Sequence, residues 1–353
     1  MRNGSVLTLC VALLLSCNGS KSSCTAGPPP VEHPPPFPVV VPGLAARPLV
    51  VHTPDALPQS AASRAEVTGL AMHGSELYVV DSVRGVLRTS LTDGTTEELA
   101  NLDRPFARPT VTTGRLYGLG DDDLVSVPTE AGDPLSVVQR GLLKPRDLAV
   151  KGSYAYVPTG QWFGRGPGEP EGKIVRVSLS GGARSDLATG QPGPVSVAVD
   201  NEHVYWTCQG AVMRVSVAGG SPERFAEFED DYPWHIVLDQ ERVYTMVQSG
   251  LGVGLYRMPK SDATPLRLAH LETMPPGLAL GDGAVHFVAE SEQPNIGTLW
   301  RLDLRDARLD TVATGIPPSC CVVADDRHLA WASGRDVLWM EHKTHEVHRA
   351  PTY

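Results

Sequence analysis

Apolar and polar positions alternate along most of this chain, and the alternation is clearest between His203 and Gly220. This stretch reads HVYWTCQGAVMRVSVAGG, which is two alternating runs joined by Gln209 and Gly210 and closed by a glycine pair. A period of two predicts β-strands with one buried face, and a short junction containing glycine predicts a hairpin turn. The pattern therefore predicts antiparallel strands.

Nearly the same phrase occurs seven times between residues 66 and 353. Each copy has a short apolar run, a turn, a second and often aromatic run, and then further short runs, of which the third frequently carries an arginine. One aligned position near the start of the copies is occupied by Gly69, Arg108, Asp147, Ser196, His235, Gly277 and Cys321. Successive members of this set lie 39 to 49 residues apart. Four short strands about every forty residues are typical of a propeller blade.

We therefore expect residues 48–353 to form an all-β domain, a seven-bladed β-propeller of four-stranded antiparallel blades, with a six-bladed ring as the alternative. A four-stranded meander is too small to bury both faces alone, so stacked blades must share a core. The seventh copy includes its own fourth run, Glu346 to Arg349, so closing the ring requires no exchanged strand. Pro48 to Thr53 is a candidate for an additional edge strand.

The composition agrees with this prediction and limits the partners. The chain has 35 glycines and 31 prolines among 353 residues, and both residue types weaken helix interiors and favour turns. The formal net charge is -10, and no cluster of lysine and arginine occurs. Because affinity for nucleic acid comes mainly from clustered cations, we expect no nucleic-acid partner.

The N-terminus is predicted to be a targeting segment. Arg2 is followed by an apolar run from Val6 to Leu15, which is far shorter than the roughly 20 residues that span a membrane. Leu14-Leu15-Ser16-Cys17 resembles the lipobox of bacterial lipoproteins. The resemblance implies that residues 1–16 are a signal peptide, that Cys17 is acylated, and that the protein is lipid-anchored in the bacterial cell envelope. The alternative is an ordinary secretory signal cut nearby.

The resemblance also bears on the membrane and on the segment after Cys17. In enteric lipoproteins an Asp after the acylated Cys retains the protein at the inner membrane, and Asn18 stands here instead, which implies the outer membrane.

In residues 17–47, Pro28 to Pro38 contains seven prolines among eleven residues. Such a tract favours polyproline II at about 3.1 Å per residue, so we expect a stalk of roughly 30 Å. A tether without a set length is the alternative.

Four cysteines remain outside the signal peptide and the lipidation site, namely Cys24, Cys208, Cys320 and Cys321. Their spacing matches neither a disulfide framework nor a zinc site. A disulfide between the adjacent Cys320 and Cys321 would be strained, so we expect two buried thiols there, with the strained disulfide as the alternative.

Two acidic groups offer oxygen ligands of the kind that calcium prefers, Asp121-Asp122-Asp123 and Glu229-Asp230-Asp231. Both occur where aspartate is favoured locally for turns, so we expect solvated turns there, no metal site and no cofactor. Calcium is the alternative.

The blade around residue 205 carries a family resemblance. Val204-Tyr205-Trp206-Thr207 followed by Ala211 to Gly220 resembles the YWTD repeats of lipoprotein-receptor propellers, and the wider pattern is similar to NHL-type and streptogramin-lyase-like propellers. Cys208 stands where the receptors place an aspartate. The resemblance implies a propeller architecture over residues 66–353 and little about function.

The aligned positions define a candidate ligand site. In a propeller the first strand of each blade lines the central channel, so Arg108, Asp147, Ser196 and His235 are expected to surround one channel mouth, with Trp234 beside them. Asp147, Ser196 and His235 suggest a catalytic triad. Packed sheets lie roughly 10 Å apart, however, and a nucleophile must approach its base to about 3 Å. We therefore expect no catalytic residue, with His235 as a lone acid or base if the protein is an enzyme.

A long connection, Gly160 to Gly172, is predicted on the same face. It reads GQWFGRGPGEPEG, and Trp162, Phe163 and Arg165 are residue types that anchor recognition. A surface loop whose aromatic rings pack on the third blade is the alternative.

Together these features predict an extracytoplasmic binding or scaffold module rather than an enzyme. Its expected partners are an envelope protein or a small ligand at the channel face, and the membrane through the lipid anchor. The alternative is a channel-mouth enzyme, such as a lactonase-like hydrolase or a lyase.

Overall fold

The structure is a computed structural model that describes residues 67–350 apart from 103, 113, 132–134, 161–171, 230, 291–295, 317–320 and 335. The chain divides into two units, residues 1–37 and 38–353, and all described residues belong to the second. The signal segment, Cys17, the proline tract and Pro48 to Thr53 lie outside the described residues. Within the described part of the chain, no helix has the length and the hydropathy that a membrane-spanning helix requires.

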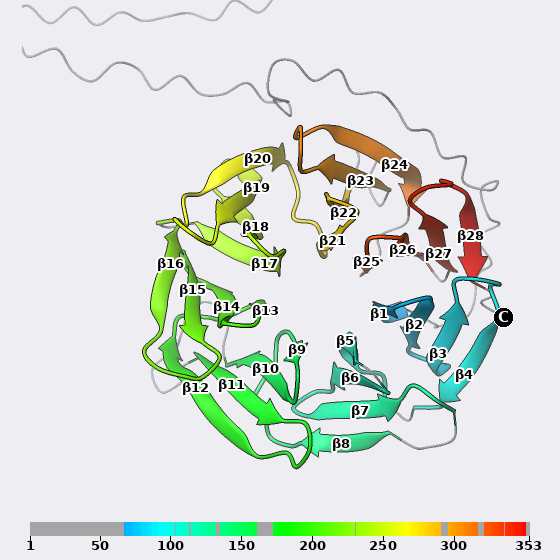
Figure 1. Cartoon of the computed structure of the whole chain (residues 1–353), viewed down its shortest axis with the longest axis horizontal. Coiled ribbons are helices and arrows are strands. Elements are labelled where there is room, and N and C mark those ends of the chain that lie inside the picture. Colours follow the sequence, from blue (N-terminus) through cyan, green and yellow to red (C-terminus); the bar gives the residue numbers. More distant parts are fainter. Residues whose placement is uncertain are drawn as a thin grey trace, which may run out of the picture. The chain divides into compact units, whose positions relative to one another are not determined.

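The described residues form seven four-stranded antiparallel sheets arranged in a ring (Figure 1). Blades 1 to 3 contain β1 (Val67–His73), β2 (Glu76–Asp81), β3 (Gly85–Ser90), β4 (Thr96–Ala100), β5 (Ala107–Thr112), β6 (Arg115–Leu119), β7 (Leu124–Pro128), β8 (Ser136–Gln139), β9 (Ala149–Lys151), β10 (Tyr154–Thr159), β11 (Gly172–Ser178) and β12 (Arg184–Gln191). Blades 4 and 5 contain β13 (Val197–Val199), β14 (His203–Cys208), β15 (Ala211–Ser216), β16 (Glu223–Glu227), β17 (Tyr232–Leu238), β18 (Arg242–Ser249), β19 (Gly252–Pro259) and β20 (Leu266–Leu271). Blades 6 and 7 contain β21 (Ala279–Gly281), β22 (Ala284–Glu290), β23 (Gly297–Asp303), β24 (Leu309–Ile316), β25 (Val322–Ala324), β26 (His328–Ser333), β27 (Asp336–Glu341) and β28 (Val347–Ala350).

Each blade is an up-and-down meander in which strands that are consecutive in the chain are neighbours in the sheet. The first strands lie around the centre of the ring in Figure 1 and the fourth strands lie at its rim. The predicted seven-bladed all-β architecture is therefore confirmed, and the six-bladed alternative is wrong.

The core lies between the blades rather than within any one of them. One apolar cluster joins Tyr156 and Ile174 of blade 3 to Val204 and Trp206 of blade 4, and all four side chains are buried. The indole Nε1 of Trp206 donates a hydrogen bond to Gln191 Oε1 of blade 3 at 3.1 Å. The repeated sequence phrase therefore reflects a repeated packing requirement, because each blade must present apolar faces to two neighbours.

The ring closes by packing of blade 7 on blade 1. Leu70 and Leu87 of blade 1 share a buried cluster with Val337 and Trp339 of blade 7. All four strands of blade 7 come from one continuous segment and pair only with one another in its sheet. The expectation that closure needs no exchanged strand is confirmed for the described residues.

A pair of buried histidines joins blades 6 and 7. His286, in β22, is fully buried, and its ring stacks on that of His342, which follows β27, with 5.4 Å between the ring centroids. His342 Nε2 donates to the carbonyl of Asp325 at 3.0 Å. Burial, and then the neighbouring His342, lower the pKa of His286 to about 3, and burial also lowers the pKa of His342. Both rings are therefore neutral at neutral pH.

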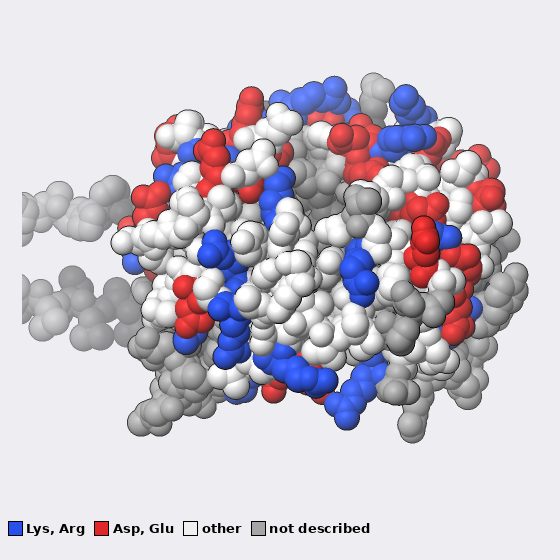
Figure 2. All heavy atoms as spheres, turned by 60° about the horizontal axis from the view of Figure 1, so that its bottom comes forward, with Lys and Arg blue, Asp and Glu red and all other residues white. Residues whose placement is uncertain are grey.

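The surface carries charges of both signs. Acidic and basic side chains are interspersed with uncharged residues over the face shown in Figure 2. Many of these charges are paired within a blade at exposed positions, such as Lys173 with Asp186 at 2.6 Å. Exposed pairs of this kind contribute little to stability.

Candidate functional site at the channel mouth

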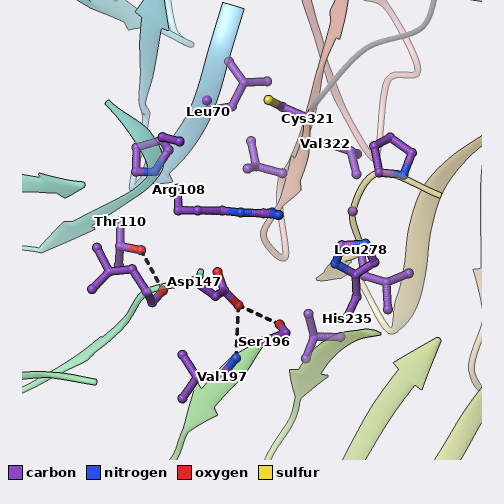
Figure 3. A pocket seen from close by; sticks show the side chains of 18 of the residues that line it. Leu70, Arg108, Thr110, Asp147, Ser196, Val197, His235, Leu278, Cys321 and Val322 are labelled. Carbon is purple, nitrogen blue, oxygen red and sulfur yellow. Dashed lines mark hydrogen bonds between the residues drawn. The ribbon is translucent and has the colours of Figure 1, made fainter. Parts of the chain in front are cut away.

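A cavity of about 460 Å³ lies where the first strands of the blades converge (Figure 3). Its lining includes every member of the aligned set, which is Gly69, Arg108, Asp147, Ser196, His235, Gly277 and Cys321. Residues spread over more than 250 positions of the chain (69 to 321) thus meet around one opening. Cavities of about 300–1000 Å³ are the usual size of small-molecule sites.

Local irregularities at the starts of the first strands direct these side chains. The register with the second strand shifts between Ala107 and Thr110 in blade 2, and between Pro233 and Ile236 in blade 5. Such bulges leave residues out of the hydrogen-bond ladder and redirect them. In blades 3 and 4 the first strands begin only at Ala149 and Val197, so Asp147 and Ser196 precede them.

Gly69 has a packing role. A Cβ atom on this residue would lie 2.2 Å from Cδ of Pro109 in the next blade. A side chain at this position would collide with Pro109, so Gly69 allows blade 2 to pack on blade 1 and offers the cavity no functional group.

Three polar members of the set bridge neighbouring blades. Asp147 Oδ2 accepts hydrogen bonds from Ser196 Oγ at 2.6 Å and from the backbone N–H of Val197 at 3.0 Å. Ser196 Oγ in turn accepts from the N–H of Ile236 at 3.3 Å. His235 Nε2 donates to the carbonyl of Pro275 at 3.0 Å. Blades 3 to 6 are thereby linked in sequence by polar contacts around the opening.

These contacts do not form a catalytic triad. The Ser196 hydroxyl donates to the Asp147 carboxylate, whereas a nucleophilic serine donates to its histidine base. His235 uses its Nε2 atom on Pro275. The assumption that neighbouring blades lie too far apart for direct contact is nevertheless wrong at the axis, where Asp147 and Ser196 of adjacent blades meet because the first strands converge.

Arg108 differs from the other polar members. Its φ angle is 54°, a left-handed conformation that is uncommon and strained for a residue with a side chain. Figure 3 shows its guanidinium reaching into the cavity. It forms neither a hydrogen bond nor an ion pair with the residues that the structure describes. Arg108 is thus a solvent-exposed cation at the cavity, whereas Asp147, Ser196 and His235 are engaged in bridging the blades.

His235 does not add a positive charge to this cavity at neutral pH. Removal from water, and then the nearby Arg108 cation, lower its pKa to about 4. A neutral imidazole can still donate its Nε2 hydrogen to Pro275, so the bridge persists. With Nε2 protonated, Nδ1 carries the lone pair of the neutral ring, so the role of His235 as a lone acid or base stays a prediction.

A smaller cavity of about 310 Å³, called here the side cavity, adjoins the channel mouth and shares five of its lining residues. The shared residues are Arg108, Asp147, Ser196, His235 and Pro276. The remaining lining residues are Arg146, Val195, Trp234, Met274 and Pro275. Trp234 was predicted from the sequence, whereas Arg146 and the Met274–Pro276 segment were not. The sequence could have indicated that segment only by its position, since it connects the fourth strand of blade 5 to the first strand of blade 6 on the face of the channel mouth.

Another cavity, of about 730 Å³, lies at the turns between the first and second strands of blades 4 and 5. Its charged groups are largely paired, with Lys260 Nζ 2.7 Å from Asp200 Oδ2 and Arg214 Nε 2.5 Å from Glu223 Oε1. The channel mouth is the stronger candidate because residues from all seven blades converge on it, whereas the larger cavity is lined by the surface turns of blades 4 and 5 with Lys151 of blade 3.

The predicted loop residues and acidic groups do not belong to the channel mouth as the structure describes it. Trp162, Phe163, Arg165, Asp230 and Cys320 lie outside the described residues. Among the described residues, no group of three or more His, Cys, Asp and Glu side chains is arranged to hold a metal ion. Asp122 Oδ1 instead accepts from the N–H of Lys144 at 2.9 Å, as a turn-forming aspartate does.

The cysteine prediction needs a correction. Cys321 is disulfide-bonded, with a partner outside the described residues, so the expected thiol at this position is wrong. Cys208 is a free and buried thiol, and burial raises its pKa to about 12. The prediction of a thiol considered only the strain of a disulfide between two adjacent cysteines. Cys321 lies at the channel mouth, directly before β25.

No protein-family model and no curated protein matches this chain. Solved structures with a similar fold include the nidogen/laminin complex, with a TM-score of 0.51 and 15% identity over 66% of this chain and 91% of that chain. Puromycin hydrolase gives 0.62 and 14% over 83% of this chain and 54% of that chain. Oligogalacturonate lyase from Vibrio parahaemolyticus gives 0.55 and 10% over 74% and 83%. At these identities the likeness shows the propeller fold alone.

Proposed function

We propose that this protein is a lipid-anchored, extracytoplasmic β-propeller of the bacterial outer membrane that binds a small anionic ligand at its channel mouth. The ligand binds against Arg108, within the cavity of about 460 Å³ that all seven blades line. Arg108 carries the proposal, because its strained backbone and its inward guanidinium place at the cavity an exposed cation that forms no hydrogen bond or ion pair with a described residue. A planar guanidinium favours carboxylate or phosphate groups.

The other polar groups of the mouth support binding rather than turnover. Asp147 and Ser196 are joined at 2.6 Å and hold adjacent blades together. The rival function, a channel-mouth hydrolase or lyase, requires a base, and His235 would be a weak one because burial lowers its pKa to about 4. No observation at the mouth favours that reaction.

The anionic ligand is tested by replacing Arg108 with glutamine in the full-length protein, purified in one nonionic detergent. A panel of small carboxylates and phosphates is titrated calorimetrically. A ligand that binds the natural protein is expected to bind Arg108→Gln about tenfold to a hundredfold more weakly, because a hydrogen bond to a charged group contributes about 1.5–3 kcal/mol. Arg108→Lys keeps the positive charge but loses the forked donors of the guanidinium, so its affinity for the ligand is expected to lie between those of the natural protein and Arg108→Gln.

Arg104→Gln is the matched control, because Arg104 lies in the connection that leads into the same strand and its side chain is 86% exposed. This variant should bind like the natural protein. Equal affinity in Arg108→Gln, or no binding of any anion, would contradict the proposed site. Conversion of a bound compound during the titration, lost in His235→Gln, would favour the enzyme instead.

The anchor is tested separately with labelled fatty acid in a bacterial host. The natural chain is expected to incorporate the label, and Cys17→Ser is expected to lose it, because the thioether-forming thiol is gone. Cys24→Ser, which lies seven residues later, should keep the label. Absence of label from the natural chain, or its persistence in Cys17→Ser, would refute the lipoprotein assignment without affecting the ligand site.

A further inference from the structure

The two cavities at the channel mouth differ in chemistry but share a boundary. Arg108, Asp147, Ser196 and His235 line both of them. A ligand group held by Arg108 therefore lies at the entrance of the side cavity, and a substituent on that group can enter it.

The side cavity has an apolar wall and a cationic edge. Trp234, Met274, Pro275 and Pro276 form the wall, while Arg108 and Arg146 both belong to the lining. An indole supplies a large rigid surface, and a thioether adapts its shape to an apolar neighbour. An apolar substituent of a ligand would gain contact with this wall.

Hydrogen bonds hold the apolar wall in place before any ligand binds. The carbonyl of Trp234 accepts from Thr207 Oγ1 of blade 4 at 3.0 Å. The carbonyl of Pro275 accepts from His235 Nε2 at 3.0 Å. The shift in register between Pro233 and Ile236 places Trp234 and His235 outside the regular ladder. His235 is therefore a positioning residue for the wall, and the side cavity is a preformed site of the kind that small ligands use.

We infer that the ligand is an amphipathic carboxylate, in which an apolar ring or branched chain lies directly beside a free carboxylate. This inference rests on the proposed function, since Arg108 must hold the anion. A volume of about 310 Å³ is near the lower end for ligand sites and suits one such substituent rather than a nucleotide. A small aryl acid and the C-terminus of a peptide ending in an apolar residue share this chemistry.

The test compares four probes by calorimetry on the full-length protein in one nonionic detergent. The probes are 3-phenylpropionate, propionate, 3-phenylpropanamide and the peptide Ala-Ala-Phe with a free C-terminus. In the natural protein we expect 3-phenylpropionate or the peptide to bind at least tenfold more tightly than propionate and the amide. A preference for the peptide or for the small acid identifies the source of the carboxylate.

The variants separate the two subsites. Trp234→Ala is expected to bring the affinity of the phenyl probes down to that of propionate, with propionate itself unchanged. Trp234→Phe should restore most of the difference, and Met274→Ala should reduce it. Trp300→Ala, in the third strand of blade 6, is the control and should preserve it. The melting temperature of each variant verifies that the ring is folded, and Met274→Ala replaces Trp234→Ala if the latter is unfolded.

The outcomes distinguish the two proposals. Equal binding of propionate and 3-phenylpropionate, both lost in Arg108→Gln, would overturn the amphipathic ligand and leave the anion site standing. A phenyl preference unchanged in Trp234→Ala and Met274→Ala would overturn the side cavity as its cause. Failure of every carboxylate to bind would overturn both.

Discussion

Replacing Trp206 with alanine is expected to lower the free energy of unfolding by about 3–5 kcal/mol, the usual cost of removing a large buried aromatic ring. Trp206 is 0% exposed and lies in the cluster that joins blades 3 and 4. The truncation leaves a cavity between two blades and also removes the donor to Gln191 Oε1. Because the core is shared between blades, the loss should affect the whole ring rather than blade 4 alone.

Urea unfolding of the full-length protein in nonionic detergent, followed by tryptophan fluorescence and circular dichroism, measures this change. Trp206→Phe keeps most of the apolar volume and is expected to cost less, about 1–3 kcal/mol, for the unpaired Gln191 oxygen and the smaller ring. Leu266→Ala is the surface control, since Leu266 is 51% exposed and should change stability by under about 0.5 kcal/mol. Equal stabilities of Trp206→Ala and Leu266→Ala would refute the interblade core.

The second large effect is acid destabilisation through His286. A histidine in the unfolded chain titrates near pH 6.5, whereas burial lowers the pKa of His286 to about 3 in the folded protein. Between these values the unfolded state binds one proton more than the folded state. Stability is therefore complete above about pH 6.5 and falls as the pH decreases toward 3. From pH 7 to pH 4 the loss amounts to about 3 kcal/mol for this residue.

The lowered pKa of His342, stacked on the same ring, adds a loss of the same sign. His286→Phe keeps an aromatic ring against His342 and removes the titrating group, so its stability should decrease less between pH 7 and pH 4. His73→Gln, at the exposed end of β1, is the control and should retain the natural pH dependence. Urea midpoints at pH 7, 5.5 and 4 measure the slopes. An unaltered slope in His286→Phe would contradict the buried neutral pair.

The candidate site was partly predictable because the repeat itself carries positional information. Arg108, Asp147, Ser196 and His235 occupy equivalent positions in successive copies, so a closed ring had to bring them to one opening. Their roles were not predictable from spacing. Asp147 and Ser196 bond to each other across a blade boundary, which leaves Arg108 as the member that faces the cavity without a described partner.

The residues that the sequence did not reveal have no periodic signature. Met274 and Pro275 lie in a connection between strands, and they form a wall only because His235, 40 residues earlier, bonds to the Pro275 carbonyl. The stacked His286 and His342 are separated by 56 positions and meet only at the boundary between blades 6 and 7. Cys321 was predicted to be a buried thiol from its neighbouring sequence, whereas in the structure it is disulfide-bonded.

The sequence by itself determined the number of blades, the strands within each blade, and the set of positions, in or just before the first strands, that share the channel mouth. These follow from periods of two and of about forty residues, which are properties of single strands and single repeats. The tertiary structure alone decided which polar groups satisfy one another and which face the cavity. The physical reason is that these contacts cross blade boundaries near the axis, where the distance between side chains depends on how the blades converge and on bulges such as those at Arg108 and Trp234.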